Sequence, residues 1–171
     1  MIICTDRSGI VDDGPTHHGI HDLSFLRNMP NLSILSPRDE NELRAMLIKS
    51  YGKNSPVLVR YPKGSSGRHF DKSLLPDFIE WGRAELVADG SDVAIWAAGG
   101  EVSTAEKVSD ILAAKGISAL VVNTRFLKPF DEALLKAHAS RMPVVSIEDC
   151  QMKGGLASNI DEALVNEKHH G

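Results

Sequence analysis

The chain has 171 residues, which at roughly 150 residues per domain predicts one ordinary domain or two small ones. It carries 19 lysines and arginines against 23 aspartates and glutamates, so its net charge is −4, and without a basic excess we expect no nucleic-acid partner. Hydrophobic residues make up 42% and charged residues 25%, which excludes a disordered chain and favours a globular protein.

The first third of the chain alternates short apolar runs with helical patterns. The runs that predict strands are residues 2–4, 32–35 and 57–59. Residues 22–28 favour a short helix, and a longer one is indicated by Ser36 as its N-cap, Pro37 in its first turn and Gly52 at its end. The chain begins inside a pattern typical of a buried strand, so we expect it to be a piece of a longer protein.

A stretch rich in proline, glycine and serine follows, and we predict a linker at residues 63–90. Beyond it, apolar runs predict three strands, at residues 93–97, 117–122 and 144–147. Helical patterns follow them, at residues 102–112, 131–139 and 156–165, the second capped by Asp131. Alternating strands and helices predict an α/β fold of two three-layer parallel-sheet units, at residues 1–62 and 91–171.

The apolar runs, the cysteines and several histidines bear on location and reactivity. No run approaches the roughly 20 residues of a membrane-spanning helix and no signal-peptide pattern occurs, so we expect a cytoplasmic protein with no membrane partner. Cys4 and Cys150 stand far apart and are expected to be reduced thiols, buried as small apolar side chains. Three histidines are expected on the solvated surface and a fourth in the linker: His138, His169 and His170, and His69.

Two arginines follow predicted strands of the first unit. Arg7 comes after the strand at 2–4, and Arg60 directly after the strand at 57–59. If these strands are parallel, both arginines emerge at one edge of the sheet and form a clamp for a carboxylate or phosphate. The alternative, which spacing alone favours, is that each arginine pairs with a neighbouring carboxylate on the surface.

The loop after the first strand carries groups suited to acid–base chemistry. Its aspartates, Asp12 and Asp13, stand near three histidines, His17, His18 and His21. A histidine beside a carboxylate moves protons near neutral pH, because its unperturbed pKa is about 6.5. His17 and His21 also have the i, i+4 spacing of helical metal ligands, but no third ligand stands at a recognisable offset. A small metal-dependent enzyme is therefore the weaker alternative.

Longer motifs follow one another along the chain. The loop reads Asp6-Arg7-Ser8-Gly9-Ile10-Val11 and then Asp13-Gly14-Pro15-Thr16-His17-His18-Gly19. Further on come Val59-Arg60-Tyr61-Pro62-Lys63-Gly64, Arg125-Phe126-Leu127-Lys128-Pro129, and Glu148-Asp149 before Gly154-Gly155. With these motifs in this order, the chain resembles the transketolase superfamily and, within it, the 1-deoxy-D-xylulose-5-phosphate synthase family. It departs from that family by being one residue shorter between Val11 and Asp13.

The resemblance implies a fold and a reaction. Residues 1–62 would be the last part of a pyrimidine-binding domain, and residues 91–171 most of a transketolase C-terminal domain. The family condenses pyruvate with glyceraldehyde 3-phosphate, with loss of CO2, to give 1-deoxy-D-xylulose 5-phosphate, using thiamine diphosphate and Mg²⁺. By the same resemblance, His17 assists proton transfers, Asp13 hydrogen-bonds the acceptor, and Arg7 and Arg60 hold the acceptor phosphate. Tyr61 and Lys63 are taken as structural.

The resemblance also implies what this chain does not supply. The main residues that bind the cofactor and the metal ion belong to parts of the family that are absent here, so we expect no cofactor or metal ligand in this portion. We therefore expect the chain to be inactive alone and to act with a missing N-terminal portion or subunit, as part of a homodimer. The alternatives are a transketolase C-terminal subunit and a non-catalytic assembly or dimerisation module.

Overall fold

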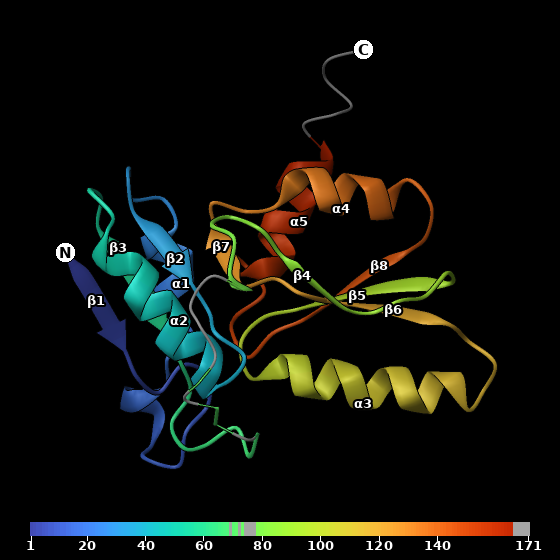
Figure 1. Ribbon diagram of the computed structural model, residues 1–171, viewed down its shortest axis with the longest axis horizontal. Helices are drawn as coiled ribbons and strands as arrows, with labels where there is room; N and C mark the ends of the chain where they lie inside the picture. The colour runs from blue at the N-terminus through green and yellow to red at the C-terminus, as the bar shows by residue number, and fades with distance from the viewer. Residues whose placement is uncertain (69, 72, 74–77, 166–171) are drawn as a thin grey trace.

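Two four-stranded sheets form the framework of the protein (Figure 1). The computed structural model describes residues 1–68, 70, 71, 73 and 78–165. The first sheet has the strand order β1 (Ile2–Thr5), β3 (Val57–Arg60), β2 (Ser33–Leu35), β7 (Phe126–Lys128). Its first three strands are parallel, and β7 runs antiparallel to β2.

The second sheet is also parallel except for one edge strand. Its order is β4 (Glu85–Ala88), β6 (Ala119–Asn123), β5 (Val93–Ala97), β8 (Val144–Ile147). Strand β4 pairs antiparallel with β6, and the other neighbours are parallel. The predicted strands of this unit are confirmed, with β6 starting two residues later than the apolar run suggested.

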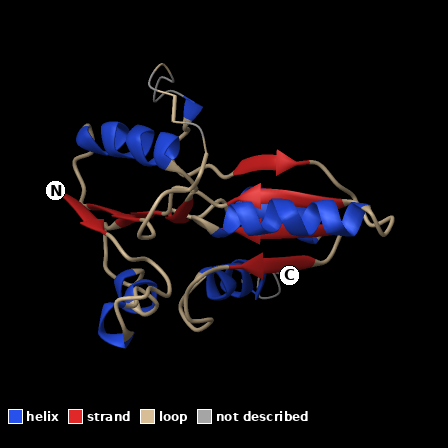
Figure 2. Cartoon of the chain, turned by 90° about the horizontal axis from the view of Figure 1, so that it is seen from below, coloured by secondary structure: helices blue, strands red, loops and turns tan. Residues whose placement is uncertain are grey.

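Helices cover both faces of the second sheet, which confirms the three-layer α/β prediction. Figure 1 shows α3 (Glu101–Ala113) on one side and α4 (Glu132–Ala139) with α5 (Leu156–Val165) on the other. In the view from below, α3 lies in front of the strands and runs along their direction (Figure 2). In β5, Ile95 packs in the cluster beneath α3, whereas Trp96 packs toward α4 and α5. This alternation follows from the two-residue period of a strand. In the first unit, α2 (Glu40–Tyr51) packs on β3.

The two sheets share one hydrophobic core. Leu58 in β3 belongs to the same buried cluster as Trp96 in β5 and Leu127 in β7. Strand β7 follows β6 along the chain but pairs in the first sheet, so the chain itself crosses between the sheets. The turn between them contains Arg125 in the left-handed region, at φ 55. Strands β4 and β7 were not predicted from the sequence.

A buried network of charged and polar side chains lies where the sheets meet. We call Arg38, Glu42, Glu85, Asn123 and Arg125 the junction network. Oε1 of Glu42 accepts hydrogen bonds from Nε of Arg125 at 2.7 Å and from Nδ2 of Asn123 at 2.8 Å. Glu85 forms ion pairs at 3.0 Å with both Arg125 and Arg38. Side chains from α2, β4 and the end of β6 are thereby joined in one network.

The predicted start of the long helix was wrong. The N-cap is Asp39, whose side chain accepts from the amide of Glu42, and the helix begins at Glu40. The amide of Ser36 instead donates to the carbonyl oxygen of Arg125 at 2.8 Å. Ser36 therefore joins the end of β2 to the turn before β7, and Asp39 caps the helix.

Two burial predictions were also wrong, and the one for Cys150 holds in part, because this side chain packs against the core. Strand β1 was expected to be buried, but it lies at a sheet edge with Ile2, Ile3 and Cys4 exposed. Cys150 is only partly buried. His138 was expected on the surface, yet it is 7% exposed and packs against Trp96.

The segment predicted as a linker is partly structured. Ile79 is fully buried and Trp81 packs on Phe126, and the segment ends in β4. His69, His169 and His170 lie outside the described residues.

Candidate functional site

The carboxyl ends of β1 and β3 place the predicted residues at one edge. The strands are parallel, with Thr5 opposite Arg60 in the register. The site loop, residues 6–21, leaves β1 at this edge. Its base is closed by paired backbone hydrogen bonds between Gly9 and Gly19 at 3.0 and 2.9 Å. Gly19 must be small here, because a Cβ on it would lie 2.4 Å from the carbonyl oxygen of Arg7. The two ends of the loop are thus joined to each other at the sheet edge.

Four charged side chains meet on the exposed part of the loop: Arg7, Asp12, Asp13 and Lys63, which we call the exposed cluster. Nε of Arg7 donates to Asp13 at 2.9 Å, and Nζ of Lys63 donates to Asp12 at 2.8 Å and to Asp13 at 3.0 Å. Hydrogen bonds from Lys63, and then from Arg7, hold the pKa of Asp13 below its ordinary value. The carboxylates in turn raise the pKa of Lys63.

Arg60 is in a different environment from Arg7. Its side chain is 5% exposed, and Nε donates to Asp22 at 3.0 Å while a terminal nitrogen donates to the carbonyl oxygen of Gly19 at 3.0 Å. The two arginines therefore do not form a joint clamp in this conformation. Each pairs with carboxylates, as the alternative from spacing expected, although the pair of Arg60 is buried rather than on the surface.

The histidines of the loop have separate positions. His17 ends a short 3-10 helix, Pro15–His17, and its exposed ring has Nδ1 3.1 Å from Oγ1 of Thr16. His18 holds the loop itself, because its Nδ1 accepts from the amide of Val11 at 3.2 Å. His21 precedes α1 (Asp22–Leu26), so His17 and His21 do not share a helix face. Their four-residue spacing therefore lacks the geometry that suggested metal binding.

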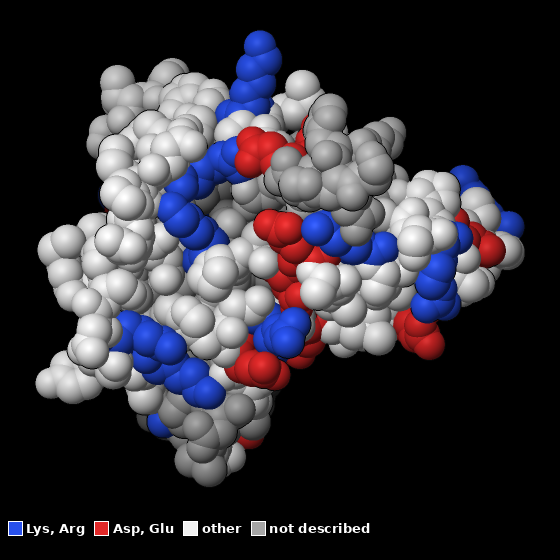
Figure 3. Space-filling model, turned by 90° about the horizontal axis from the view of Figure 1, so that it is seen from above, with Lys and Arg blue, Asp and Glu red and all other residues white. Residues whose placement is uncertain are grey.

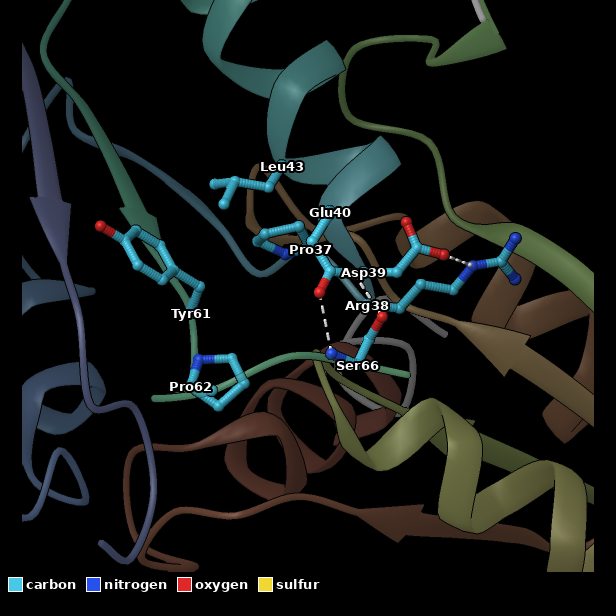
Figure 4. Close-up of a pocket in the computed structure, with 9 residues that line it drawn as sticks. Pro37, Arg38, Asp39, Glu40, Leu43, Tyr61, Pro62 and Ser66 are labelled. Atoms are coloured by element: carbon cyan, nitrogen blue, oxygen red, sulfur yellow. Dashed lines mark hydrogen bonds and ion pairs between the residues drawn. The ribbon is translucent and has the colours of Figure 1, made fainter. Parts of the chain in front are cut away.

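The chain after β3 is anchored to α2. Glu40 accepts from the amide of Ser66 at 2.9 Å and from the hydroxyl of Ser65 at 2.8 Å, and the hydrogen bonds from Ser66 lower the pKa of Glu40 to about 2. A small cavity of about 50 Å³ lies between the start of α2 and Tyr61 (Figure 4). This anchor holds the segment that carries Lys63.

Residues of both units line the space behind the site loop. A cavity of about 40 Å³ there is bordered by Ser8 and Arg60 of the first unit and by Glu101, Glu148 and Asp149 of the second. The face seen from above, on the side of α4 and α5, is a different one, and basic and acidic side chains lie close together on it as well (Figure 3). Around the cavity, polar groups at the carboxyl ends of both sheets therefore face a common space, as parallel α/β sheets favour.

The described residues do not fit a metal site, since no group of three or more His, Cys, Asp or Glu among them is placed to hold an ion. Within the same described part, no helix is long and apolar enough to cross a membrane.

The structure brings Arg7, Asp13 and His17 onto one loop and sets Arg60 beneath it. Lys63 was taken as structural, and its ion pairs with Asp12 and Asp13 were not predicted. Its place in the loop that follows a parallel strand was the signal available for them. The contact from Asp149 was not predicted either; this residue follows the carboxyl end of β8 and reaches the site loop from the second unit.

Comparison with known families gives two matches that together cover most of the chain. The transketolase pyrimidine binding domain matches residues 1–68, and the transketolase C-terminal domain matches residues 82–171. Among curated proteins, 1-deoxy-D-xylulose-5-phosphate synthase of Syntrophomonas wolfei is 44% identical over 98% of this chain, and that of Heliobacterium modesticaldum is 43% identical over 99%. The chain spans only 26% of the length of either relative.

Solved structures give the same assignment of fold. A chain described as a split gene transketolase, inactive beta4 tetramer, matches 97% of this chain with a TM-score of 0.86 and 32% identity, and 54% of that chain is covered. A transketolase of Pichia stipitis in complex with sedoheptulose 7-phosphate matches 87% of this chain with a TM-score of 0.69 and 26% identity, over 23% of its own length.

Proposed function

Because this chain belongs to the transketolase family, we propose that it is the acceptor side of a thiamine-diphosphate-dependent synthase. The reaction joins pyruvate to glyceraldehyde 3-phosphate, releases CO2 and forms 1-deoxy-D-xylulose 5-phosphate. The names of the relatives support this choice within the family. The observation that carries the proposal is the site loop, which carries Arg7 hydrogen-bonded to Asp13 and, further along, the exposed His17.

Each of these side chains has a role in the proposal. Arg7 receives the acceptor phosphate when its exposed pairs with Asp6 and Asp13 open, because its side chain is 36% exposed and a guanidinium matches phosphate geometry. Asp13 accepts a hydrogen bond from an acceptor hydroxyl, and His17 transfers a proton to or from the reacting groups. Arg60 contributes to phosphate binding only if its buried pair with Asp22 opens, since that pair occupies its guanidinium.

The cofactor and its metal ion belong to another part of the enzyme in this proposal. The described residues provide no cluster suited to Mg²⁺. Thiamine diphosphate, held by residues outside this chain, would supply the carbanion chemistry. We therefore propose that the chain is inactive alone and works in the cytoplasm with an N-terminal portion, as part of a homodimer. The exposed apolar side chains of edge strand β1 are consistent with a protein partner at that edge.

The test is reconstitution. The full chain, alone and mixed with a segment that supplies the cofactor-binding residues, is assayed for CO2 release that depends on glyceraldehyde 3-phosphate. We expect no turnover from the chain alone, turnover in the mixture, and its loss in His17→Ala. The exposed residue Lys107 on α3 provides a control, since Lys107→Ala should leave the rate unchanged. Turnover by the chain alone, or by His17→Ala in the mixture, would refute the proposal.

One observation favours a second candidate, a separate C-terminal subunit of a transketolase. It is the 0.86 TM-score to the chain described as a split gene transketolase. The reconstituted enzyme distinguishes the two candidates by its donor. A synthase uses pyruvate and releases CO2, whereas a transketolase moves a two-carbon unit from a ketose phosphate without releasing CO2.

A further inference from the structure

The loop between β8 and α5 contacts both arms of the site loop. On the incoming arm, the amide of Ile10 donates to Oδ2 of Asp149 at 3.1 Å. On the outgoing arm, the carbonyl oxygen of Ile20 accepts from the amide of Gln151 at 3.1 Å and from Sγ of Cys150 at 3.0 Å. Three successive residues of the second unit therefore hold the two arms of a first-unit loop.

The side chain of Gln151 adds a further contact on the outgoing arm. Its Oε1 lies 2.7 Å from Nδ1 of His21, the residue that precedes α1. Three residues after Gln151, Gly154 approaches α1 closely. A Cβ on Gly154 would lie 2.6 Å from Cα of Ser24 in that helix. The β8–α5 loop is thus packed against the site loop and against the helix that follows it.

The position of Asp149 requires a glycine in the site loop. A Cβ on Gly9 would lie 1.8 Å from Oδ2 of Asp149, so the carboxylate occupies the space that any other residue would fill. Gly9 also has φ +88, a conformation that glycine adopts readily. The backbone at Gly9 is therefore shaped to receive this carboxylate.

Asp149 lies in a short loop that is held at both ends, by β8 and by α5. Its neighbour Glu148 accepts from the amides of Leu156 at 2.6 Å and Ala157 at 3.0 Å, in the first turn of α5. On the other side, Ile147 ends β8, which pairs with β5. Glu148 thus fixes the end of this short loop to α5, and Asp149 reaches across to the other unit.

Near Ile10 the site loop is held by polar contacts rather than by apolar packing. Ile10 is 70% exposed, so the loop buries little apolar surface at this point. Loops of this kind open with low free energy unless polar anchors hold their base, and hydrogen bonds to a charged acceptor are the stronger ones. The hydrogen bonds at Ile10 and Ile20 are polar anchors directly beside the Gly9–Gly19 closure, and the one from Ile10 has a charged acceptor.

We propose that residues 149–151 of the second unit form a clamp that orients the site loop, with Asp149 as a positioning residue for Arg7 and Asp13. The inference rests on the proposed function, because it concerns the same acceptor-side loop. In this proposal the C-terminal unit helps to form the acceptor site, although its residues are far from the site loop in the sequence. It holds the backbone of the site loop and does not contact the substrate.

Amide exchange in the full chain, measured by NMR, tests the clamp without any cofactor. Asp149→Ala should accelerate exchange at Ile10 by at least about tenfold, and also at Gly9 and Gly19, since these amides close the loop base. Asp149→Asn keeps an acceptor oxygen and should restore most of the protection. If only Ile10 responds, Asp149 merely satisfies one amide and the proposal is wrong.

A matched control is Asp92, whose carboxylate accepts from the amide of Ser118 at 2.7 Å in the second unit. Asp92→Ala should accelerate exchange at Ser118 and leave Gly9 and Gly19 unchanged. A general loosening of the fold would change both sets and would contradict the clamp. If Asp149→Ala does not fold, Asp149→Ser, whose side chain is too short to reach Ile10, replaces it.

A kinetic readout follows in the reconstituted enzyme. Asp149→Ala should raise KM for glyceraldehyde 3-phosphate by about tenfold and leave KM for pyruvate unchanged, because only the acceptor-side loop moves. An equal rise in both constants, or no change in either, would overturn the positioning role. If the unsubstituted mixture shows no turnover, the proposed function fails while the exchange experiment still decides on the clamp.

Discussion

The junction network and the exposed cluster are built from the same kinds of side chain in opposite surroundings. In the junction network, Glu42 and Arg125 have side chains that are 1% and 6% exposed. In the exposed cluster, Lys63 and Asp12 have side chains that are 45% and 84% exposed. Both contain two basic and two acidic residues at hydrogen-bonding distance.

The difference shows how burial decides what a charge cluster does. A buried ion pair is held in one arrangement, because removing one partner leaves the other charge without water or a counter-ion. An exposed pair is screened by solvent and exchanges partners easily. The junction network is therefore suited to joining the sheets. In the proposed function, the pairs of the exposed cluster open and free Arg7 for the acceptor phosphate.

The largest effect is expected at the centre of the junction network. Glu42→Ala leaves Arg125 buried without its closest partner and should lower the free energy of unfolding by about 3–5 kcal/mol. The measurement is urea unfolding of the full chain. Glu132→Ala serves as the control, since its i, i+4 pair with Lys136 is half exposed and should contribute less than about 1 kcal/mol. Equal losses in the two variants would contradict the contrast.

An intermediate effect on stability is expected at His138, a buried histidine. Burial, and then the charge of Arg141, lower the pKa of His138, although Asp131 and Asp89 act in the opposite direction. The unfolded chain therefore binds this proton more readily than the folded one. Stability should be fully present above the unfolded pKa of about 6.5 and should fall as pH drops below it.

His138→Gln should remove that part of the pH dependence. The measurement is the free energy of unfolding in urea at several pH values between 5 and 8. The pH dependence that the variant loses should correspond to about one titrating histidine. A variant whose slope against pH matches that of the unsubstituted chain would show that His138 does not cause it.

The smallest effect on stability is expected in the exposed cluster. Lys63→Gln should leave the urea midpoint unchanged, because its pairs are solvated. It should raise the pKa of Asp13 toward its ordinary value, since Lys63 is the main cause of the lowered pKa. Carboxyl titration by NMR measures this shift, and high salt should produce a similar change without the substitution. A clear loss of stability would show that this cluster is structural after all.

The sequence predicted the central elements of the fold because those depend on local patterns. The apolar runs of β3 and β5 and the cap at Asp131 were sufficient for that. Strands β4 and β7 were missed, since both are short antiparallel additions whose pairing depends on partners distant in the chain. Strand β1 was expected to be buried because its apolar run has no signal that separates an edge strand from a central one.

For the site, the sequence predicted where individual residues lie but not which distant residues they contact. The parallel pairing of β1 and β3 could be anticipated, and with it the common edge for Arg7 and Arg60. The burial of Arg60 could not, because it depends on Asp22, which lies 38 residues away along the chain. The contact from Asp149 to Ile10 joins residues 139 apart, and no spacing rule reaches across two units.

The most direct test of the account measures how the reconstituted enzyme discriminates between glyceraldehyde 3-phosphate and unphosphorylated glyceraldehyde. The ratio of kcat/KM values should favour the phosphorylated acceptor, and Arg7→Gln should reduce that ratio by at least about tenfold while Lys107→Gln leaves it unchanged. A ratio that Arg7→Gln leaves intact would contradict the claim that the exposed cluster is the acceptor-phosphate site.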